Sequence, residues 1–428
     1  MSSSLTNRDQ QVIWHPYTQH KNMLPPIAIT KSKGALLFDE NNNSYIDAIS
    51  SWWVTIHGHA HPYIAEKVYE QAKKLEHVIF TGFTHEPAVQ LAERLLKILP
   101  GDFSKIFYSD NGSTAVEVAI KMAIQFWKNE SVNSQWSTVN RTKIVAFRNS
   151  YHGDTFGTMS VSERSVFTIS FQDYLFEVIF IDTPTAENIN DLKKKINSLS
   201  NEIACFIYEP LLQAAGGMLM YDAQLLDELL TEIRSKNIIC IADEVMTGFY
   251  RTGKFFASDY LKNKPDIICL SKGLTGGTMA LGVTAATQKI FDAFLSDDRS
   301  KTFFHGHSFT ANPIACSAAL ASLDLIERDD CVLRVQNIVK RNEDFITRLQ
   351  TKNYKLKTKN HRHLGTIIAF EIVSESDSYL NNISVTITQQ ALQKGIYLRP
   401  LGNTVYIMPP YCITENELNK VYEFLLKI

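Results

Sequence analysis

Several features that would indicate particular classes of protein are missing from this chain of 428 residues. None of its six cysteines forms a C-x-x-C pair, and Cys205, Cys240 and Cys269 lie within apolar segments, which favours buried thiols over metal ligands or disulfides. A formal net charge of −2 gives no reason to expect nucleic acid or an anionic membrane as partner. No apolar run could span a bilayer, and the start MSSSLTNRDQQ lacks the pattern of a secretory signal. We therefore expect a reducing, cytoplasmic setting.

Short apolar runs alternate with amphipathic stretches from about residue 105 onward. The runs include KIFYSD, KIVAFRN, IACFIYEPLL, IICIADEV and DIICLSKG, and the stretches between them have helical periodicity. Strands that are apolar throughout are typical of a parallel sheet with helices on both faces. The alternation predicts an α/β fold with a mostly parallel central sheet.

The regular alternation of apolar runs and amphipathic stretches ends near residue 325. There we predict a long polar helix over VLRVQNIVKRNEDFITRLQ, a linker rich in lysine and histidine over TKNYKLKTKNHRH, a strand, a helix, a hairpin over IYLRPLGNTVYIMPPY and a final helix. We predict three parts: an N-terminal segment (1–50) that belongs to a smaller domain, a large domain (51–324), and the rest of a smaller α+β domain (325–428).

Two of the predicted strands end in an isolated ionisable residue. Asp243 follows IICIA, and Lys272 follows IICL. Because parallel strands end at one edge of a sheet, both side chains can face one crevice. Lys272 precedes Gly273, Gly276 and Gly277, which is the reverse of the order in a phosphate-binding G-x-x-x-x-G-K-[ST] loop. The structural alternative is a buried salt bridge between Asp243 and Lys272.

Three further segments carry polar groups next to predicted strands. In SDNGSTAVE, Gly112 and Ser113 would start a helix, where free N–H groups bind phosphate or the hydroxyls simply cap the helix. In NSYHGDTFG, Tyr151 could stack on a planar ring or be a core tyrosine. In YLRPLGN, Arg399 suits a carboxylate ligand or a structural ion pair.

Histidines cluster in HGHAHP (His57, His59 and His61) and in HGH (His305 and His307). The H-x-H spacing fits a metal site, because alternate residues of a strand share a face. Glycine and alanine interrupt both clusters, and neither has a carboxylate or cysteine close by. We interpret the clusters as loops that line a pocket, and we predict no metal.

One cofactor would use a phosphate anchor, a ring stacker, an acid, a lysine and a carboxylate clamp together, namely pyridoxal 5′-phosphate. The motifs FIYEPLLQAAGGM, IADEVMTGFYRTGKFFA and DIICLSKGLTGG occur in an order and spacing that resembles the class III aminotransferases of fold type I. The resemblance runs over nearly the whole chain. Further motifs, WHPYTQ, SSWWVTIHGHAHP, GFTHEPA and LRPLGNTVYIMPPY, resemble the branch that forms 7,8-diaminononanoate in biotin synthesis.

The resemblance implies a role for each candidate residue around the cofactor. Lys272 would form the Schiff base and then move a proton between substrate and cofactor. Asp243 would pair with the pyridinium nitrogen, Tyr151 would stack on the ring and face the substrate, and Gly112 and Ser113 would hold the phosphate.

The resemblance also implies a homodimer with shared sites. His307 and Ser308 of the partner subunit would complete the phosphate site. The substrate pocket would contain Tyr151 and the further residues Tyr17, Trp52, Gly306, Arg399, Arg251 and Asp154, with Arg399 binding the carboxylate of the oxo acid.

The implied reaction is transamination of 8-amino-7-oxononanoate to 7,8-diaminononanoate. His307 and Ser308 stand where well-known bacterial relatives have proline and threonine; a serine hydroxyl still binds phosphate, but the amine donor is left open between S-adenosylmethionine, which we expect, and lysine. The alternatives are another class III aminotransferase, acting on ω-amino acids with pyruvate or 2-oxoglutarate, and a binding protein that keeps the fold without the chemistry.

Overall fold

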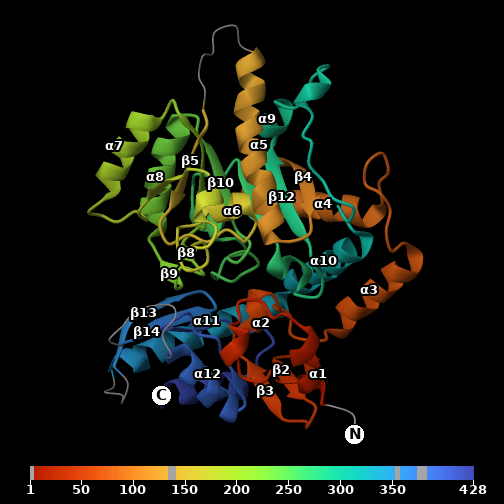
Figure 1. Ribbon diagram of the computed structural model, residues 1–428, viewed down its shortest axis with the longest axis vertical. Helices are drawn as coiled ribbons and strands as arrows, with labels where there is room; N and C mark the ends of the chain where they lie inside the picture. The colour runs from red at the N-terminus through yellow and green to blue at the C-terminus, as the bar shows by residue number, and fades with distance from the viewer. Residues whose placement is uncertain (1–3, 134–140, 352–356, 374–382) are drawn as a thin grey trace.

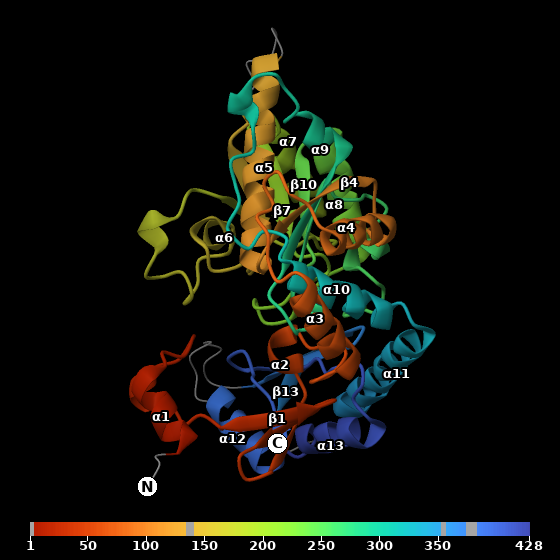
Figure 2. The same cartoon turned by 90° about the vertical axis from the view of Figure 1, so that its right-hand side faces the viewer.

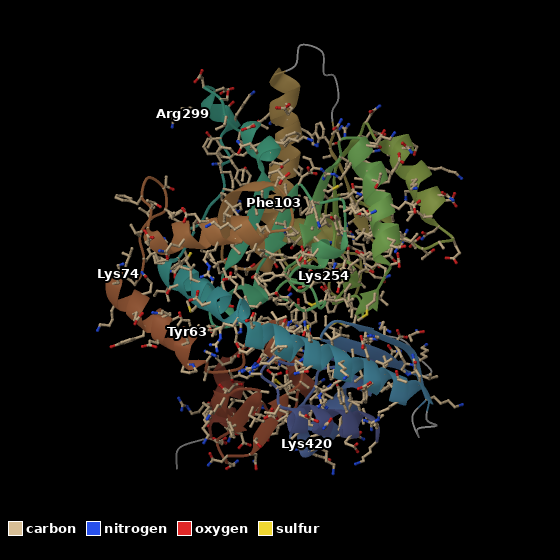
Figure 3. The ribbon with its side chains drawn as sticks, turned by 180° about the vertical axis from the view of Figure 1, so that it is seen from behind. Tyr63, Lys74, Phe103, Lys254, Arg299 and Lys420 are labelled. Carbon is tan, nitrogen blue, oxygen red and sulfur yellow. The ribbon has the colours of Figure 1, made fainter. Side chains whose placement is uncertain are left out.

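The computed structural model describes residues 4–133, 141–351, 357–373 and 383–428 in two lobes, a larger one built on a sheet and a smaller one that contains both ends of the chain (Figure 1). Helices α3 (Pro62–Lys74) and α10 (Pro313–Ile326) lie where the lobes meet. Tyr63 of α3 donates a hydrogen bond to Asp324 of α10 (2.8 Å), and Figure 3 shows Tyr63 near this junction.

A seven-stranded sheet forms the centre of the larger lobe. Its strands, in order across the sheet, are β4 (Phe103–Ser109), β12 (Gly282–Thr287), β11 (Ile267–Leu270), β10 (Ile239–Asp243), β7 (Ile203–Tyr208), β5 (Lys143–Phe147) and β6 (Ile179–Ile181). Only β12 runs antiparallel to its neighbours in this sheet. The predicted α/β fold with a mostly parallel sheet is therefore confirmed.

Both faces of this sheet are buried, which explains the continuous apolar runs. In β7, Phe206 and Tyr208 pack into one hydrophobic cluster while Cys205 and Ile207 pack into another. The first cluster contains side chains of α4 (Glu86–Ile98) and α8 (Ala223–Ser235), and the second contains α5 (Gly112–Asn133). Figure 2 shows α5 on one side of β7 and β10, with α8 and α4 on the other.

The smaller lobe joins the two ends of the chain in one sheet. Strands β1 (Ile29–Lys33), β2 (Leu36–Asp39) and β3 (Ser44–Asp47) form it with β15 (Ile396–Tyr397), which runs parallel to β3. A second sheet contains β13 (Thr358–Leu364), β14 (Ile367–Ile372) and β16 (Thr404–Ile407). The smaller lobe also contains the helices α11 (Asp329–Thr351), α12 (Ile383–Gln393) and α13 (Glu415–Leu425).

The remaining elements are short. They are the helices α1 (Leu5–Val12), α2 (Ser50–Trp53), α6 (Phe156–Val161), α7 (Ile189–Leu199) and α9 (Gln288–Asp292), the strands β8 (Leu212–Gln213) and β9 (Leu219–Met220), and the 3-10 turns η1 (His20–Asn22), η2 (Gln172–Tyr174), η3 (Ala257–Tyr260), η4 (Lys272–Thr275) and η5 (Arg299–Lys301). Within the described ranges, every helix is too short or too polar to cross a membrane.

Two sequence predictions in the smaller lobe are wrong. The second half of the supposed linker TKNYKLKTKNHRH is strand β13, and residues 352–356 lie outside the described part of the chain. Because β13 is the outer strand of its sheet, its charged side chains need no burial. The supposed hairpin is not a hairpin either, because β15 and β16 belong to different sheets. A turn with Gly402 at φ 59° redirects the chain between them.

Candidate active site

A cavity of about 460 Å³ lies where the parallel strands of the large sheet end. Five of the parallel strands deliver residues at or just after their ends to the cavity wall, as expected for the carboxyl edge of such a sheet. The wall includes Gly112 and Ser113 after β4, Tyr151 and His152 after β5, Glu209 after β7, Asp243 at the end of β10, and Lys272 after β11.

Lys272 lies at the start of η4 with a positive φ of 44°, a conformation that a residue with a side chain rarely adopts. The Ser271 hydroxyl donates to the Leu281 carbonyl (2.7 Å) and helps to hold this turn. The ammonium nitrogen lies 4.9 Å from the ring centre of Trp53. Burial lowers the pKa of Lys272, and the charges of Asp243 and Glu209 oppose this shift. A lowered pKa favours the neutral amine, which is the form that attacks carbonyls and accepts protons.

Asp243 pairs with a histidine and not with the lysine. Its Oδ2 lies 2.8 Å from Nδ1 of His152, and its Oδ1 accepts a hydrogen bond from the Val245 N–H (3.1 Å). Among the described residues, therefore, the alternative of a structural Asp243–Lys272 salt bridge is wrong. Nε2 of His152 is buried without a hydrogen-bond partner in the described chain.

Glu209 and His152 are two cavity residues that we did not select from the sequence. The Glu209 carboxylate accepts hydrogen bonds from the N–H groups of Tyr151 and Ala214 (both 3.0 Å). Burial raises the pKa of Glu209 to about 7. The signal that identified Asp243, an acid directly after an apolar strand, also applies to Glu209 in IACFIYEP.

The start of α5 also lines the cavity. Asn111 caps the helix, since its side-chain oxygen accepts from the Thr114 N–H (2.9 Å). The Ser113 hydroxyl is therefore not the cap, and it accepts a hydrogen bond from the Asp154 N–H instead (3.1 Å). A Cβ at Gly112 would lie 2.6 Å from Cγ1 of Val245, so this position has room only for glycine. The first N–H groups of a helix lack intrahelical acceptors, which makes this end suitable for an anion.

Tyr151 links the strand ends to the N-terminal segment. Its hydroxyl lies 3.1 Å from that of Tyr17, and the Tyr17 hydroxyl also donates to Asp154. Burial, the hydrogen bond with Tyr17 and the charge of Asp154 raise the pKa of Tyr151 well above its ordinary value. Tyr151 is therefore neutral and able to donate a hydrogen bond at physiological pH.

Trp52 and Arg399 stack beside Tyr17. The Arg399 guanidinium lies 4.4 Å from the ring centre of Trp52, and the ring of Tyr17 meets that of Trp52 edge-on at 5.3 Å. The parallel pairing of β3 with β15 explains the contact, because Trp52 follows β3 and Arg399 follows β15. The three residues thus form a cluster of two aromatic rings and one cation, which reaches the cavity wall through the contact of Tyr17 with Tyr151.

Eight candidate residues are absent from the cavity wall. Tyr17, Trp52, Arg399 and Asp154 form the cluster that meets the cavity at Tyr151, and Arg251, Gly306, His307 and Ser308 lie outside this cluster. Arg251 is 1% exposed and donates to the carbonyls of Pro409 (3.0 Å) and Trp53 (3.4 Å), so it can reach a ligand only through Trp53. Gly306, His307 and Ser308 lie on a separate segment, in which the His307 N–H donates to the Thr310 hydroxyl (3.1 Å).

The clustered histidines have other partners. His57 lies 3.0 Å from the Ser322 hydroxyl, His59 lies 2.8 Å from Asp47, and His305 lies 2.9 Å from the Lys121 amine. Over the ranges that the structure describes, no group of three or more histidine, cysteine or acidic side chains could hold a metal ion.

Comparisons with known proteins give a consistent family. The class-III aminotransferase family model matches residues 17–428. The chain is 45% identical over 421 residues to the adenosylmethionine-8-amino-7-oxononanoate aminotransferase of Synechococcus elongatus, which covers 96% of each protein.

Solved structures agree with this match. The adenosylmethionine-8-amino-7-oxononanoate aminotransferase of Methanocaldococcus jannaschii superposes with a TM-score of 0.92 at 35% identity, covering 98% of each chain. An amine transaminase from an uncultivated Pseudomonas species, solved in its PLP-bound form, has a TM-score of 0.88 at 29% identity, covering 97% of each chain. The chain therefore belongs to the class-III aminotransferases, a family of enzymes that depend on pyridoxal 5′-phosphate.

Proposed function

We propose that this enzyme transaminates 8-amino-7-oxononanoate to 7,8-diaminononanoate in biotin biosynthesis, with S-adenosylmethionine as the amine donor. One observation carries the proposal: the cavity that contains Lys272 and Asp243 meets, at Tyr151, a cluster in which Tyr17 contacts Trp52 and Arg399 stacks on Trp52. The names of the relatives from Synechococcus elongatus and Methanocaldococcus jannaschii support this choice of substrate.

The residues of the cavity fit pyridoxal 5′-phosphate. The cavity wall contains an acid, an amine, and a helix N-terminus with a glycine that a Cβ would crowd. When bound, the cofactor supplies an electrophilic carbon and a ring that accepts electrons. Asp243 would bind the protonated ring nitrogen, and Gly112 and Ser113 would bind the phosphate.

Lys272 and Asp243 would do the chemical work of the protein. The buried amine of Lys272, with its lowered pKa, is suited to take a proton from the substrate carbon that bears the amine, and it would deliver this proton to C4′ of the cofactor. Asp243 stays oriented because His152 and the Val245 N–H bind its two oxygens. Tyr151 would cover the ring and turn its hydroxyl toward the substrate.

The cluster of Tyr17, Trp52 and Arg399 would bind the amine acceptor. Arg399 is a planar cation suited to bidentate capture of the carboxylate of 8-amino-7-oxononanoate. The Trp52 ring fixes the plane of the guanidinium, and Tyr17 and Asp154 supply a polar edge for the amino group. Arg251 would support this cluster from behind through the carbonyl of Trp53.

We further propose a cytoplasmic homodimer in which each cavity is completed by Gly306, His307 and Ser308 of the partner subunit. Two facts support this contribution of the partner subunit to each cavity. These residues lie away from the cavity of their own chain, and the aromatic rings of Phe304 and Phe309 beside them are 75% and 61% exposed. Exposed aromatic side chains next to polar ones are typical of an interface.

The test is an assay of the purified enzyme with 8-amino-7-oxononanoate and one donor at a time. We expect 7,8-diaminononanoate, identified by mass spectrometry, with S-adenosylmethionine. Product with lysine alone would reassign the donor. Absence of product with both donors, together with turnover of an ω-amino acid and pyruvate or 2-oxoglutarate, would assign the enzyme to another branch of the family. A protein without any turnover would be a binding protein with this fold.

A further inference from the structure

The turn that carries Trp52 and Trp53 has a strained backbone. Ser50, Ser51 and Trp53 have positive φ angles of 53°, 61° and 69°. Ser51 combines φ 61° with ψ −84°, close to the rare γ-turn with positive φ. Side chains at positive φ are disfavoured and persist only where the surroundings hold them. Something in the fold must therefore keep this turn in place.

This turn presents both tryptophans to the active site. The ring of Trp53 lies 4.9 Å from the Lys272 amine, and its indole N–H donates to the Tyr406 hydroxyl (2.9 Å). The ring of Trp52 lies 4.4 Å from the Arg399 guanidinium. A change in the turn would therefore move the cavity wall at Lys272 and the cluster at Arg399 together.

The carboxylate of Asp47 binds the turn from inside. It is fully buried at the end of β3, and its oxygens accept hydrogen bonds from the N–H groups of Ile49 (3.2 Å) and Ser51 (2.6 Å) and from the Ser51 hydroxyl (3.1 Å). Nε2 of His59, at the other end of the following loop, lies 2.8 Å away. These contacts all come from the turn or from the loop that leaves it, so the acid acts on this one feature.

We propose that Asp47 is a positioning residue, whose buried carboxylate holds the strained turn and thereby sets Trp52 against Arg399 and Trp53 against Lys272. Asp47 is not one of the residues that line the cavity. The inference rests on the proposed function only where turnover is measured, because the position of the tryptophans can be observed without substrate.

The test compares Asp47→Asn with Asp39→Asn. Asp39 is a matched control, because it is also a buried acid of this sheet and binds the N–H groups of Asn41 (2.9 Å) and Asn43 (2.8 Å), but its turn is remote from the tryptophans. The amide keeps the shape of the side chain and removes one acceptor. Ser51→Gly is added to Asp47→Asn as a rescue, because glycine adopts positive φ without strain.

Two readouts separate positioning from general stability. In protein labelled with 5-fluorotryptophan, the ¹⁹F resonances of Trp52 and Trp53, assigned with Trp52→Phe and Trp53→Phe, should shift or broaden in Asp47→Asn and not in Asp39→Asn. With substrate, kcat/KM should fall at least tenfold and up to the roughly 100-fold that a misplacement of about 1 Å causes. The fall should appear in both KM for the acceptor and kcat, and the double variant should recover most of it.

Unchanged fluorine resonances and unchanged kinetics in Asp47→Asn would overturn the inference. So would an equal loss in Asp39→Asn, or a double variant that recovers nothing. If Asp47→Asn does not fold, Ser51→Val tests the same point with the acid intact, since a β-branched residue resists positive φ; wild-type resonances and kinetics there would also overturn it. A wild-type enzyme that fails to turn over 8-amino-7-oxononanoate would refute the proposed function and leave the fluorine test valid.

Discussion

On one side of the cavity, Lys272, Asp243 and Glu209 follow neighbouring strands of the central sheet and are buried in the larger lobe. The other side lies outside the cavity wall and meets it at Tyr151: Tyr17 and Trp52 are 45% and 37% exposed, and with Arg399 they come from three distant segments of the chain. Sheet topology alone brings the first group together, whereas the second depends on a strained turn and on pairing between the two ends of the chain. We infer that the first side supplies the reaction and the second the choice of substrate.

The strongest test of this division is Lys272→Ala. We expect transamination to fall by roughly 10⁴-fold, at the upper limit of what a positioned proton-transfer group contributes. The measurement is kcat for the half-reaction with the amine donor. Lys254→Ala is the control, because that lysine is exposed on the same lobe and donates to the Asp259 carbonyl. Comparable losses in the two variants would contradict the role of Lys272.

Asp243→Asn should have the next largest effect, a fall in kcat of about 10²- to 10³-fold, because it removes a preorganised charge from a buried site. The control is Asp266→Asn. Asp266 is also buried and accepts from the Cys240 N–H (2.9 Å), but it precedes β11 and so lies at the opposite edge of the sheet. An equal loss of activity in both variants would show that the position of Asp243 at the carboxyl edge of the sheet is not the cause of the loss.

Arg399→Ala tests the other side and should act mainly on KM. Loss of a charge-assisted bidentate contact should raise KM for 8-amino-7-oxononanoate by about 10- to 100-fold and change kcat much less. The KM of Arg399→Lys should lie between that of Arg399→Ala and that of the wild type, since lysine keeps the charge and loses the planar stack on Trp52. A fall in kcat with unchanged KM would place Arg399 in the chemistry and break the division.

The last prediction concerns stability and Glu209, and it leaves the catalytic constants aside. The pKa of this group is raised from 4.5 to about 7 in the fold, so its contribution to stability is fully present below about pH 4.5 and is lost as pH rises through about 7. Glu209→Gln replaces the titratable carboxyl group by an amide that does not titrate. The free energy of unfolding should therefore depend less on pH, by about 3 kcal/mol at most between pH 5 and 8.

Calorimetric melting temperatures at several pH values would measure this difference. Glu202→Gln is the control, because the Glu202 side chain is about half exposed in a surface pair with Lys143. Parallel pH profiles for the wild type and Glu209→Gln would show that the buried acid does not hold its proton.

The sequence predicted much of the first side and little of the second. Apolar strands followed by Asp243 and Lys272 are local signals, and the carboxyl-edge rule brings them together. His152 was missed because its partner, Asp243, is distant in the chain, and Glu209 because the same strand-end signal was not applied to it. The stack of Arg399 on Trp52 depends on the pairing of β3 with β15, which no local pattern contains. The roles of these residues and the domain limits at 50 and 324 stay predictions.

The parallel pairing of β3 with β15 also constrains how the enzyme is made. Ile46 pairs with Ile396, so β3 cannot complete its pairing until almost the whole chain has been synthesised, although β1, β2 and β3 can already pair with one another. The larger lobe has no such delay, because its sheet is complete once β12 has emerged. During synthesis, the nascent chain would thus carry a folded reaction side and a three-stranded N-terminal sheet whose edge at β3 still lacks its partner, and this open edge is the part that a chaperone has most reason to cover.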